Sequence, residues 1–358
     1  MEVELKDIQY PRTNEDVERM KHAIIDYENA RSPGEKERTK AVLKMFHKHF
    51  PKTPEAFQNR IHGYLYLKYM YLYIYKMASA LGRFGFGPNT AVRPTEPIDE
   101  EIEDLINMCV QRANMGSMEI ETNAYHGKVL ILDDAKKFFK ITEDINLTDL
   151  PKTVIPYTEA RSAVMKNYQA LGVIECSCRH IRGDAGCWPR DVCITIGEPW
   201  VSFQEEYLVG GMKPRRITQE EALKILDEQH ELGHVHNVFF KDACNDQMYG
   251  ICNCCSCCCV AMQAQNYAKC PMFAPSGYLS KVDNEKCVGS GTCVSKCSFG
   301  VLEIVDGKRS IVEGKSCMGC GVCVDNCPHG ALELVRDDPN INEPFDLDVL
   351  IPKYSAKQ

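Results

Sequence analysis

The sequence predicts an α+β protein of several domains, and the distribution of its cysteines is the main observation behind this prediction. The chain has 358 residues, of which 20 are cysteine. Residues 1–175 contain a single cysteine, Cys109, and the other nineteen lie between Cys176 and Cys327. We therefore expect four parts: a mainly helical half over 1–150, an α/β cysteine-rich middle over 151–279, a repeat over 280–338 and a tail over 339–358.

Helix breakers separate four candidate helices in the N-terminal half, at 14–31, 35–49, 54–81 and 98–114. Two strand-like runs follow at 117–122 and 127–132, and a helix followed by a hairpin predicts a winged-helix-like module. The last helix has five acidic side chains and only Arg112 as a base. A helix that faces phosphates should be basic, so we expect a docking or scaffold role and no nucleic-acid binding.

The net charge and the N-terminal residues further restrict the class of protein that we expect. The formal net charge of −8 disfavours a protein whose main partner is nucleic acid or an anionic membrane surface. The first 21 residues carry charges throughout and lack the apolar core of a secretory signal, so we expect a cytoplasmic protein whose cysteines bind metal. The tyrosine-rich segment 64–87 is interrupted by Lys68 and Lys76, which predicts a buried helix rather than a membrane span.

The cysteine-rich middle alternates helical and strand-like patterns. Residues 157–168 favour a helix that leads into an apolar run, ALGVIEC. Thr218 and Glu221 have the spacing of a capping box, and Gly233 marks the end of the helix that they begin. The sequence HVHNVFF at 234–240 then predicts a strand.

An internal repeat with a period of 30 residues lies within 281–338. The run FGVLEIV at 299–305 returns as HGALELV at 329–335, and three cysteines of each copy coincide. The second copy contains CMGCGVCVDNCP at 317–328, which is the C-x2-C-x2-C-x3-C-P spacing of bacterial [4Fe–4S] ferredoxins. Such a duplication predicts pseudo-twofold symmetry.

The repeat resembles the two-cluster bacterial-type ferredoxins over roughly 58 residues. The resemblance implies a C-terminal two-cluster ferredoxin domain, in which a pair of ββα-like repeats surrounds both clusters. One [4Fe–4S] cluster would be held by Cys317, Cys320, Cys323 and Cys297. The other cluster would be held by Cys287, Cys293 and Cys327.

The first copy departs from the ferredoxin pattern at one ligand position. It places Ser290 where the second cysteine belongs, between Cys287 and Cys293. Three outcomes remain open: a [3Fe–4S] cluster, a [4Fe–4S] cluster with a serinate or other oxygen ligand, or loss of the cluster. Three retained thiolates disfavour loss, and we favour [3Fe–4S] slightly over the oxygen-ligated cluster.

Twelve cysteines lie between residue 176 and the repeat, enough for at most three further clusters at four thiolates each. They are Cys176, Cys178, Cys187, Cys193, Cys244, Cys252, Cys254, Cys255, Cys257, Cys258, Cys259 and Cys270. Loop spacing would group Cys252 with Cys255 and Cys258, whereas a helix would group Cys252 with Cys255 and Cys259. Adjacent cysteines cannot all point at one small cluster, so we expect two overlapping ligand sets that serve two sites.

Three chemistries fit these upstream cysteines. We favour one or two extra [4Fe–4S] clusters because of the ferredoxin motif downstream. Structural zinc is an alternative, held by four cysteines or by three cysteines and a histidine such as His180, His234 or His236, and redox-active thiols are another. Arg179 and His180 could contact a cofactor, offset the thiolate charge and raise its reduction potential, or they could be ordinary surface charges.

The combined pattern also resembles a group of ferredoxin-domain proteins, over about 151–338. The matching text is VIECSCRH, a spaced GC and DVC, and ICNCCSCCC, followed by the repeat. This resemblance implies an iron–sulfur electron-transfer protein or redox subunit that passes low-potential electrons between a donor and a partner oxidoreductase, within a complex or a homo-oligomer. The alternatives are an enzyme that reduces a small substrate at a cluster with an open corner, and a redox-responsive regulator that binds nucleic acid. The sequence has no dinucleotide fingerprint and no P-loop.

Overall fold

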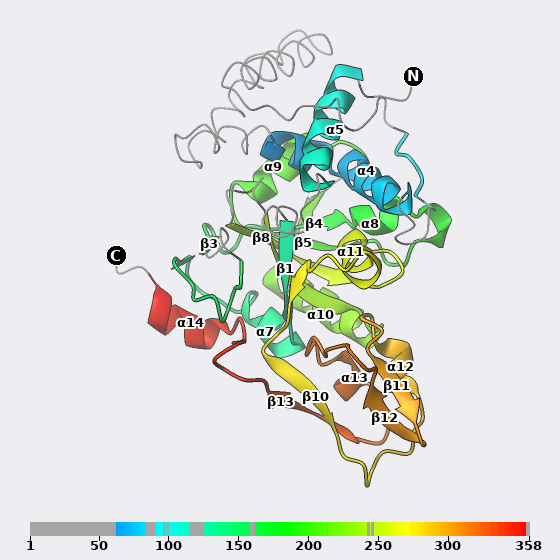
Figure 1. Cartoon of the computed structure of the whole chain (residues 1–358). Helices are drawn as coiled ribbons and strands as arrows, with labels where there is room; N and C mark the ends of the chain where they lie inside the picture. Colours follow the sequence, from blue (N-terminus) through cyan, green and yellow to red (C-terminus); the bar gives the residue numbers. More distant parts are fainter. Residues whose placement is uncertain are drawn as a thin grey trace.

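The structure, a computed structural model, describes residues 62–83, 91–95, 98, 100–114, 125–157, 162–212, 214–241, 244 and 247–355. A seven-stranded sheet lies at its centre, in the order β6-β4-β5-β8-β7-β1-β9 (Figure 1). Neighbouring strands are antiparallel except for β1 and β9, which are parallel. The strands are β1 (Tyr125–Leu130), β4 (Leu171–Glu175), β5 (Asp191–Ile196), β6 (Arg215–Arg216), β7 (Val235–Lys241), β8 (Gln247–Cys254) and β9 (Phe273–Ala274).

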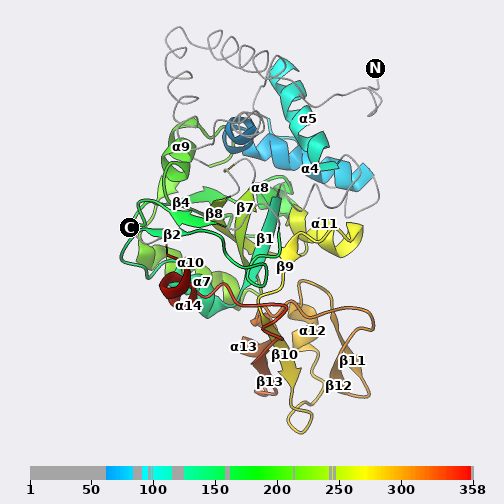
Figure 2. The same cartoon turned by 60° about the vertical axis from the view of Figure 1, so that its left-hand side comes forward.

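Helices cover both faces of this sheet (Figures 1 and 2). They are α4 (Met70–Arg83), α7 (Leu132–Lys137), α8 (Ser177–His180), α9 (Trp200–Tyr207), α10 (Gln219–Glu231) and α11 (Val260–Ala268), and α5 (Glu100–Asn114) packs on the outside of α4. Because successive side chains of a strand point to opposite faces, the sheet supplies two cores. Phe239 is buried in the core that includes α4, α5 and α11, whereas its neighbour Phe240 is buried in the core that includes α7 and α10.

The tyrosine-rich segment forms the buried helix that the sequence predicts. Residues 62–83 are helical with an interruption at Tyr69. Tyr71 donates a hydrogen bond of 3.1 Å to the carbonyl of Glu175, and the hydroxyls of Tyr66 and Tyr249 lie 2.9 Å apart. Such bonds compensate the burial of polar hydroxyls. In the described part of the chain, no helix has the length and apolarity that crossing a bilayer requires.

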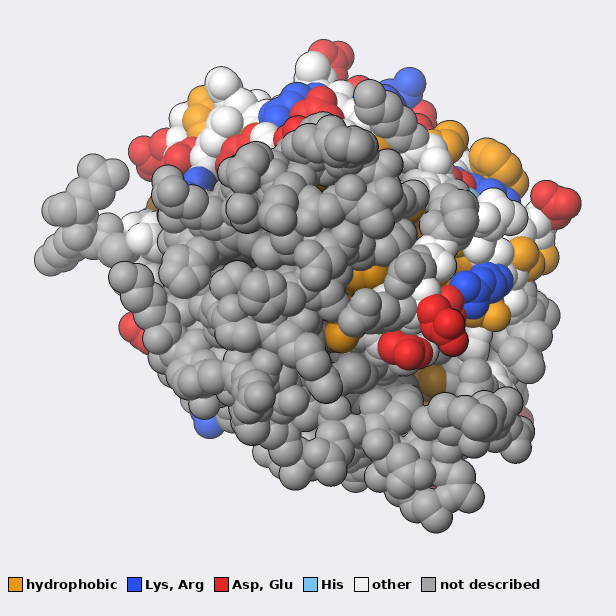
Figure 3. All heavy atoms as spheres, turned by 90° about the horizontal axis from the view of Figure 1, so that it is seen from above, with side chains coloured by type: hydrophobic (Ala, Val, Ile, Leu, Met, Phe, Trp, Pro, Cys, Tyr) orange, Lys and Arg blue, Asp and Glu red, His pale blue; other side chains and the backbone are white. Residues whose placement is uncertain are grey.

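The acidic helix α5 packs against α4 with Ile102, Ile106 and Cys109 buried between them. Its Glu103 forms ion pairs with Lys76 of α4 and with Arg93. Viewed from the α5 end, acidic side chains of the described residues lie beside basic ones (Figure 3). That face therefore shows no continuous basic surface among the residues described. The helices predicted at 14–31 and 35–49 lie outside the described residues.

The described residues do not form the winged-helix-like module that the sequence predicts. The run predicted at 127–132 contributes instead to β1, which pairs with β7 and β9 of the central sheet. The other strand of the predicted hairpin, 117–122, lies outside the described residues. Part of the N-terminal half therefore shares one sheet with the cysteine-rich middle.

The helix predicted over 157–168 is also wrong where the chain is described. Residues Ala163–Met165 form β3, which pairs antiparallel with β2 (Ile145–Leu147). Ala163 and Met165 are both buried on one side of β3, which is a period of two rather than the period of a helix. Because the pairing partner lies some twenty residues upstream, the local sequence did not reveal it.

Helix α10 and strand β7 agree with the sequence prediction. The Thr218 side chain accepts a hydrogen bond of 3.1 Å from the backbone N–H of Glu221, which is the predicted N-cap. Gly233 follows the helix with φ +90°, a conformation that favours glycine. The sequence HVHNVFF then enters β7, which is buried throughout.

The C-terminal repeat folds as two halves whose strands pair with each other. The first half has β10 (Tyr278–Val282), α12 (Thr292–Lys296) and β11 (Leu302–Val305), and the second has β12 (Lys308–Ile311), α13 (Val322–Asp325) and β13 (Leu332–Arg336). Strand β10 pairs with β13, and β11 pairs with β12, so each half gives one strand to each small sheet. This unit lies at the end of the molecule opposite α5 (Figure 1).

The tail returns to the central part of its own chain. Helix α14 (Leu347–Tyr354) lies beside α7 (Figure 2). Phe345, which precedes it, is fully buried and stacks on Phe138 with ring centroids 5.5 Å apart. The tail therefore completes the core that includes α7 and α10, instead of extending away from the molecule.

Candidate metal centres

The cysteine-rich stretch at 252–259 is neither one helix nor one loop. Strand β8 ends at Cys254, a turn follows, and α11 begins at Val260. The strand period of two places Cys252 and Cys254 on the same face. The structure consequently divides ten upstream cysteines into a group of six and a group of four, a division that differs from both groupings considered from the spacing.

The group of six lies against the sheet and forms a closed ring of thiols, of which three are buried and three are partly buried. Its members come from the end of β4, from α8, β5 and β8, and from the residue that caps α11. Each thiol contacts two others, in the order Cys176, Cys178, Cys259, Cys254, Cys252, Cys193. Within this ring the sulfurs of Cys254 and Cys259 lie 3.5 Å apart. We call this group the six-thiol ring.

The pKa values of the thiols in the six-thiol ring favour the binding of metal cations. Hydrogen bonds from Cys178 and Cys193 hold the pKa of Cys176 well below its usual value, although burial opposes this. The pKa of each of the other five thiols is raised. Several adjacent thiolates repel one another in a buried site. Metal cations would allow the ring to carry thiolates, because thiolates are the form that binds metal.

A cavity of about 50 Å³ adjoins the six-thiol ring. All six ring cysteines line it, together with apolar and aromatic side chains that include Tyr66, Ile74, Phe239 and Tyr249. Burial, together with the nearby Cys252, raises the pKa of both Tyr66 and Tyr249, so these hydroxyls stay neutral. No sequence signal pointed to this pair, because the two tyrosines are 183 residues apart.

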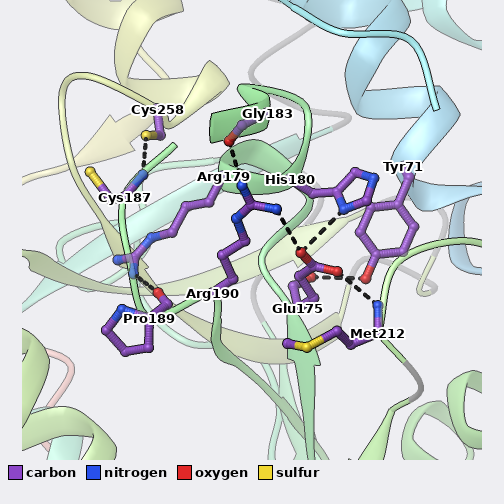
Figure 4. A network of polar contacts seen from close by, with 10 residues as sticks. All are labelled: Tyr71, Glu175, Arg179, His180, Gly183, Cys187, Pro189, Arg190, Met212 and Cys258. Carbon is purple, nitrogen blue, oxygen red and sulfur yellow. Dashed lines mark hydrogen bonds and ion pairs between the residues drawn. The ribbon is translucent and has the colours of Figure 1, made fainter. Parts of the chain in front are cut away.

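The second group consists of Cys187, Cys255, Cys257 and Cys258, whose sulfur atoms all lie within 4.8 Å of one another. Cys187 belongs to the loop before β5, and the other three belong to the turn after β8. We call this the four-thiol group. The backbone N–H of Cys187 points at the sulfur of Cys258, 3.4 Å away (Figure 4).

Arg179 lies close to cysteines of both thiol groups and is almost completely buried. Its guanidinium donates hydrogen bonds to Gln229 (2.8 Å) and to the carbonyl of Asn253 (3.0 Å). It also donates to the carbonyl of Pro189 (Figure 4). Burial would lower its pKa, but negative charge on Cys176 and then on Cys255 raises it. The guanidinium therefore lies close enough to cysteines of both groups for their charges to interact.

The histidines considered as zinc ligands have other partners. The ring of His180 contacts that of Tyr71 in a tilted arrangement with centroids 4.6 Å apart, and His180 Nδ1 lies 3.2 Å from Glu175 (Figure 4). His234 Nδ1 lies 2.8 Å from Gln229, and His236 Nδ1 lies 2.7 Å from Asn253 Oδ1. Burial lowers the pKa of His234 to about 4 and that of His236 to about 3, so both are neutral at pH 7.

The remaining two upstream cysteines lie at other buried positions. Cys244 is close enough to Tyr66 and Tyr249 to raise their pKa values. The sulfur of Cys270 lies 3.4 Å from Met272 Sδ. Neither cysteine belongs to the six-thiol ring or to the four-thiol group in the described part of the chain.

In the first copy of the repeat, Cys287, Cys293 and Cys327 line one small cavity of about 20 Å³. Ser290, Arg309 and His329 line the same cavity. The Ser290 side chain is exposed, and its hydroxyl lies 3.5 Å from Thr292 Oγ1. The three thiols assigned to this site from the sequence therefore line one cavity together with Ser290.

In the second copy, Cys320 and Cys323 are close enough to Cys317 and Cys297 for their charges to interact. Burial, and then the charge of Cys317 among the other thiolates, raises the pKa of Cys323 to about 11. The backbone N–H of Gly319 lies 3.4 Å from the sulfur of Cys317, a contact typical of cluster-binding loops.

Glycines at matching positions shape both loops. Gly289 and Gly319 have φ values of +67° and +68°, and a side chain at either position would overlap neighbouring backbone. Gly291 and Gly321 precede α12 and α13 with φ values of +79° and +83°. The two loops therefore have similar backbone conformations at the matching glycines.

Residues 286–332 match the family model of the 4Fe–4S dicluster domain. The chain thus contains a ferredoxin-like segment, and the match supports at least one [4Fe–4S] cluster there. Searches of curated proteins and of solved structures found no match. The donor set fits the cofactor on structural grounds as well, because the cysteines of each copy converge and the glycine-bounded loops leave room beside them.

Proposed function

We propose that this protein is a multi-cluster iron–sulfur electron carrier that passes electrons between a donor and a partner oxidoreductase. The observation that carries the proposal is the convergence of cysteines at three places in one chain: both copies of the repeat and the six-thiol ring. Bound iron–sulfur clusters supply one-electron redox chemistry at such sites.

The cysteines divide among the clusters as follows. Cys317, Cys320, Cys323 and Cys297 would hold a [4Fe–4S] cluster. Cys287, Cys293 and Cys327 would hold a [3Fe–4S] cluster, because Ser290 offers no thiolate. The six-thiol ring would hold one further [4Fe–4S] cluster, since six thiols are too few for two clusters that each need four thiolates.

Helix α11 supports electron transfer between the ring and the repeat. Its capping residue is the ring member Cys259, and its side chain Asn266 donates a hydrogen bond of 2.9 Å to the carbonyl of Ser298 in the repeat. Gln265 Nε2 also lies 3.9 Å from Met318 Sδ. The rise from Cys259 to Gln265 is about 9 Å along an α-helix. A short, packed path therefore joins the two regions.

The electron-transfer role is tested by reducing the protein and then letting it reduce a second protein. Anaerobic protein is reduced with dithionite, freed of excess reductant and mixed with oxidised cytochrome c, a general one-electron acceptor. We expect rapid release of about three electrons per chain, one from each cluster. A protein that stores no electrons, or that cannot pass them to another protein, would contradict the proposal.

The cluster type at Ser290 is tested with Ser290→Cys. The wild-type protein should show the S = 1/2 EPR signal of an oxidised [3Fe–4S] cluster. Ser290→Cys should abolish this signal and add about one iron per chain, because it completes the four-cysteine motif. Ser295→Cys, which adds an exposed thiol in α12 away from this cavity, is the control and should change neither quantity.

Reduction of a small substrate is a second candidate function, because an apolar-lined cavity adjoins the six-thiol ring. Turnover of a candidate substrate by the isolated reduced protein, with no second protein present, would favour this enzymatic role over electron carriage.

A further inference from the structure

We propose that Cys187, Cys255, Cys257 and Cys258 bind a single zinc ion in a tetrahedral site that is separate from the iron–sulfur clusters. The inference does not depend on the electron-transfer role, because none of these four thiols belongs to the six-thiol ring or to the repeat.

The distances within the four-thiol group are those of a mononuclear site. Cys257 Sγ lies 3.2 Å from Cys187, 3.3 Å from Cys255 and 3.7 Å from Cys258, and Cys187 lies 3.7 Å from Cys255. A zinc–sulfur bond of about 2.3 Å gives a tetrahedron whose edges are about 3.8 Å. The four sulfurs therefore need to move only slightly to surround one ion.

A cubane cluster would require a more open arrangement. In a [4Fe–4S] cluster each thiolate binds a different iron, so the four thiolates stand further apart than around one ion. Among the residues that the structure describes, this group is the compact set of metal-ligand side chains, and neither the cysteines of the repeat nor those of the ring form such a set. Neighbouring thiols of the six-thiol ring contact one another in pairs, but in the described part of the chain no three thiols of the ring or of the repeat lie mutually this close.

The chain geometry explains why Cys255, Cys257 and Cys258 can share one ion. The backbone N–H of Cys259 bonds to the carbonyl of Cys255 at 3.0 Å, which closes a tight turn. This turn brings the three sulfurs together, and the loop before β5 supplies Cys187 from about 70 residues away. The backbone N–H of Cys187 near the sulfur of Cys258 is a hydrogen bond suited to a metal-bound thiolate (Figure 4).

The charge of the site is also accommodated. Zinc would form four zinc–sulfur bonds and displace the four thiol protons to solvent, which leaves a net charge of about −2 on the centre. The buried guanidinium of Arg179 interacts with Cys255 and Cys187 and offsets part of this charge. We favour zinc over ferrous iron because zinc binds the same ligands more tightly.

The proposed ion ties two distant segments together beside the six-thiol ring. It would fix the turn that ends at the ring member Cys259 to the loop that precedes β5, which contains the ring member Cys193. A zinc site here is therefore structural, since all four ligands come from the protein.

The test is metal analysis of the full-length chain, produced with both metals supplied and purified anaerobically. We expect one zinc per wild-type chain. Cys257→Ser should lose at least nine-tenths of this zinc, while iron and sulfide per chain stay unchanged. Cys109→Ala, which removes a core thiol between α4 and α5, should keep zinc, iron and sulfide at wild-type levels.

Three results would overturn the zinc site: wild-type protein without zinc, a single iron in its place, or loss of iron and sulfide in Cys257→Ser while the protein stays folded. X-ray absorption at the zinc edge of the wild-type protein covers the case in which the variant does not fold. It should show four sulfur ligands at about 2.3 Å. Nitrogen or oxygen ligands would refute the assignment. The zinc content and the zinc-edge spectrum are independent of the iron-based tests of electron transfer.

Discussion

His230 of α10 and Asp325 of α13 form a hydrogen bond between Nε2 and Oδ2, 2.8 Å apart. His230 is buried, whereas the side chain of Asp325 is 54% exposed. Because a carboxylate can only accept, Nε2 of His230 donates. His230 Nδ1 in turn lies 3.2 Å from Nε2 of His236, which bonds Asn253 beside the ring cysteines. A chain of hydrogen bonds therefore joins the ferredoxin-like repeat to the central sheet.

Loss of the His230–Asp325 contact should loosen the repeat from the sheet. We expect Asp325→Ala to lower the free energy of unfolding by about 1–2 kcal/mol, because a buried histidine loses its partner. Urea denaturation of the anaerobic protein measures this difference. Glu313→Ala, at an exposed acidic residue of the same repeat, is the matched control. Equal effects of the two substitutions would show that the contact does not stabilise the protein.

Gly319→Ala should disrupt the loop around the second-copy cluster. Its added methyl group would overlap the carbonyl oxygen of Tyr278 and the hydroxyl of Ser276. Gly330→Ala is the matched control, because Gly330 also has positive φ (+55°) but no atom lies near the added carbon. Backbone strain alone should cost about 1–2 kcal/mol in both variants.

Gly319→Ala should in addition lose about four irons per chain, whereas Gly330→Ala should keep its full iron content. Iron analysis of the two purified variants measures this contrast. Full iron in Gly319→Ala would argue that this loop does not bind a cluster.

Lys128 should make stability depend on pH. Burial lowers its pKa to about 7, and its amine donates to Asn342 Oδ1 (2.9 Å) and to the carbonyl of Glu343 (2.8 Å). Between pH 7 and about 10.5 the unfolded chain holds a proton that the folded chain lacks. The free energy of unfolding should therefore rise with pH in this window, by up to about 1.4 kcal/mol per pH unit.

Lys128→Met should remove this contribution. Relative to wild type, the variant should gain roughly 2 kcal/mol less stability between pH 7 and pH 9, as measured by urea denaturation. Lys224→Met, at an exposed lysine of α10, should leave the wild-type pH dependence unchanged. A wild-type slope in Lys128→Met would refute the assignment to Lys128.

Arg179→Gln should make the ring cluster harder to reduce. The substitution removes a buried positive charge beside Cys176 and keeps a side chain that can form hydrogen bonds. One charge at about 8 Å with an effective dielectric constant of about 20 corresponds to roughly 2 kcal/mol, or roughly 90 mV. An EPR-monitored redox titration should show one couple shifted to lower potential.

Arg190→Gln is the control for this titration, since Arg190 lies in the same region and bonds Glu175 instead (Figure 4). It should shift the couple much less. If both variants shift it equally, or neither does, Arg179 does not tune the cluster.

Local signals allowed parts of this structure to be predicted, and long-range pairing limited the rest. The spacing from Cys317 to Cys327 predicts a cluster-binding loop, because three of the four cysteines expected to bind the cluster lie close together in sequence, within 317–323. The grouping of Cys252 and Cys254 could not be predicted, because it depends on β8 pairing with β7. A short apolar run carries no signal that separates strand from helix.

Distant partners explain the other differences. The run at 127–132 was expected in a local hairpin, yet β1 pairs with β7 more than a hundred residues later. The contact between Tyr66 and Tyr249, and that between Cys187 and Cys257, likewise join segments whose proximity only the folded sheet creates.

The most direct test of the account is the iron and sulfide content of wild-type protein purified without oxygen and reconstituted with both elements. The proposed function predicts about eleven irons and about twelve sulfides per chain, with EPR signals that appear and disappear reversibly on reduction and oxidation. A colourless protein with no iron, no sulfide and no redox activity would contradict it.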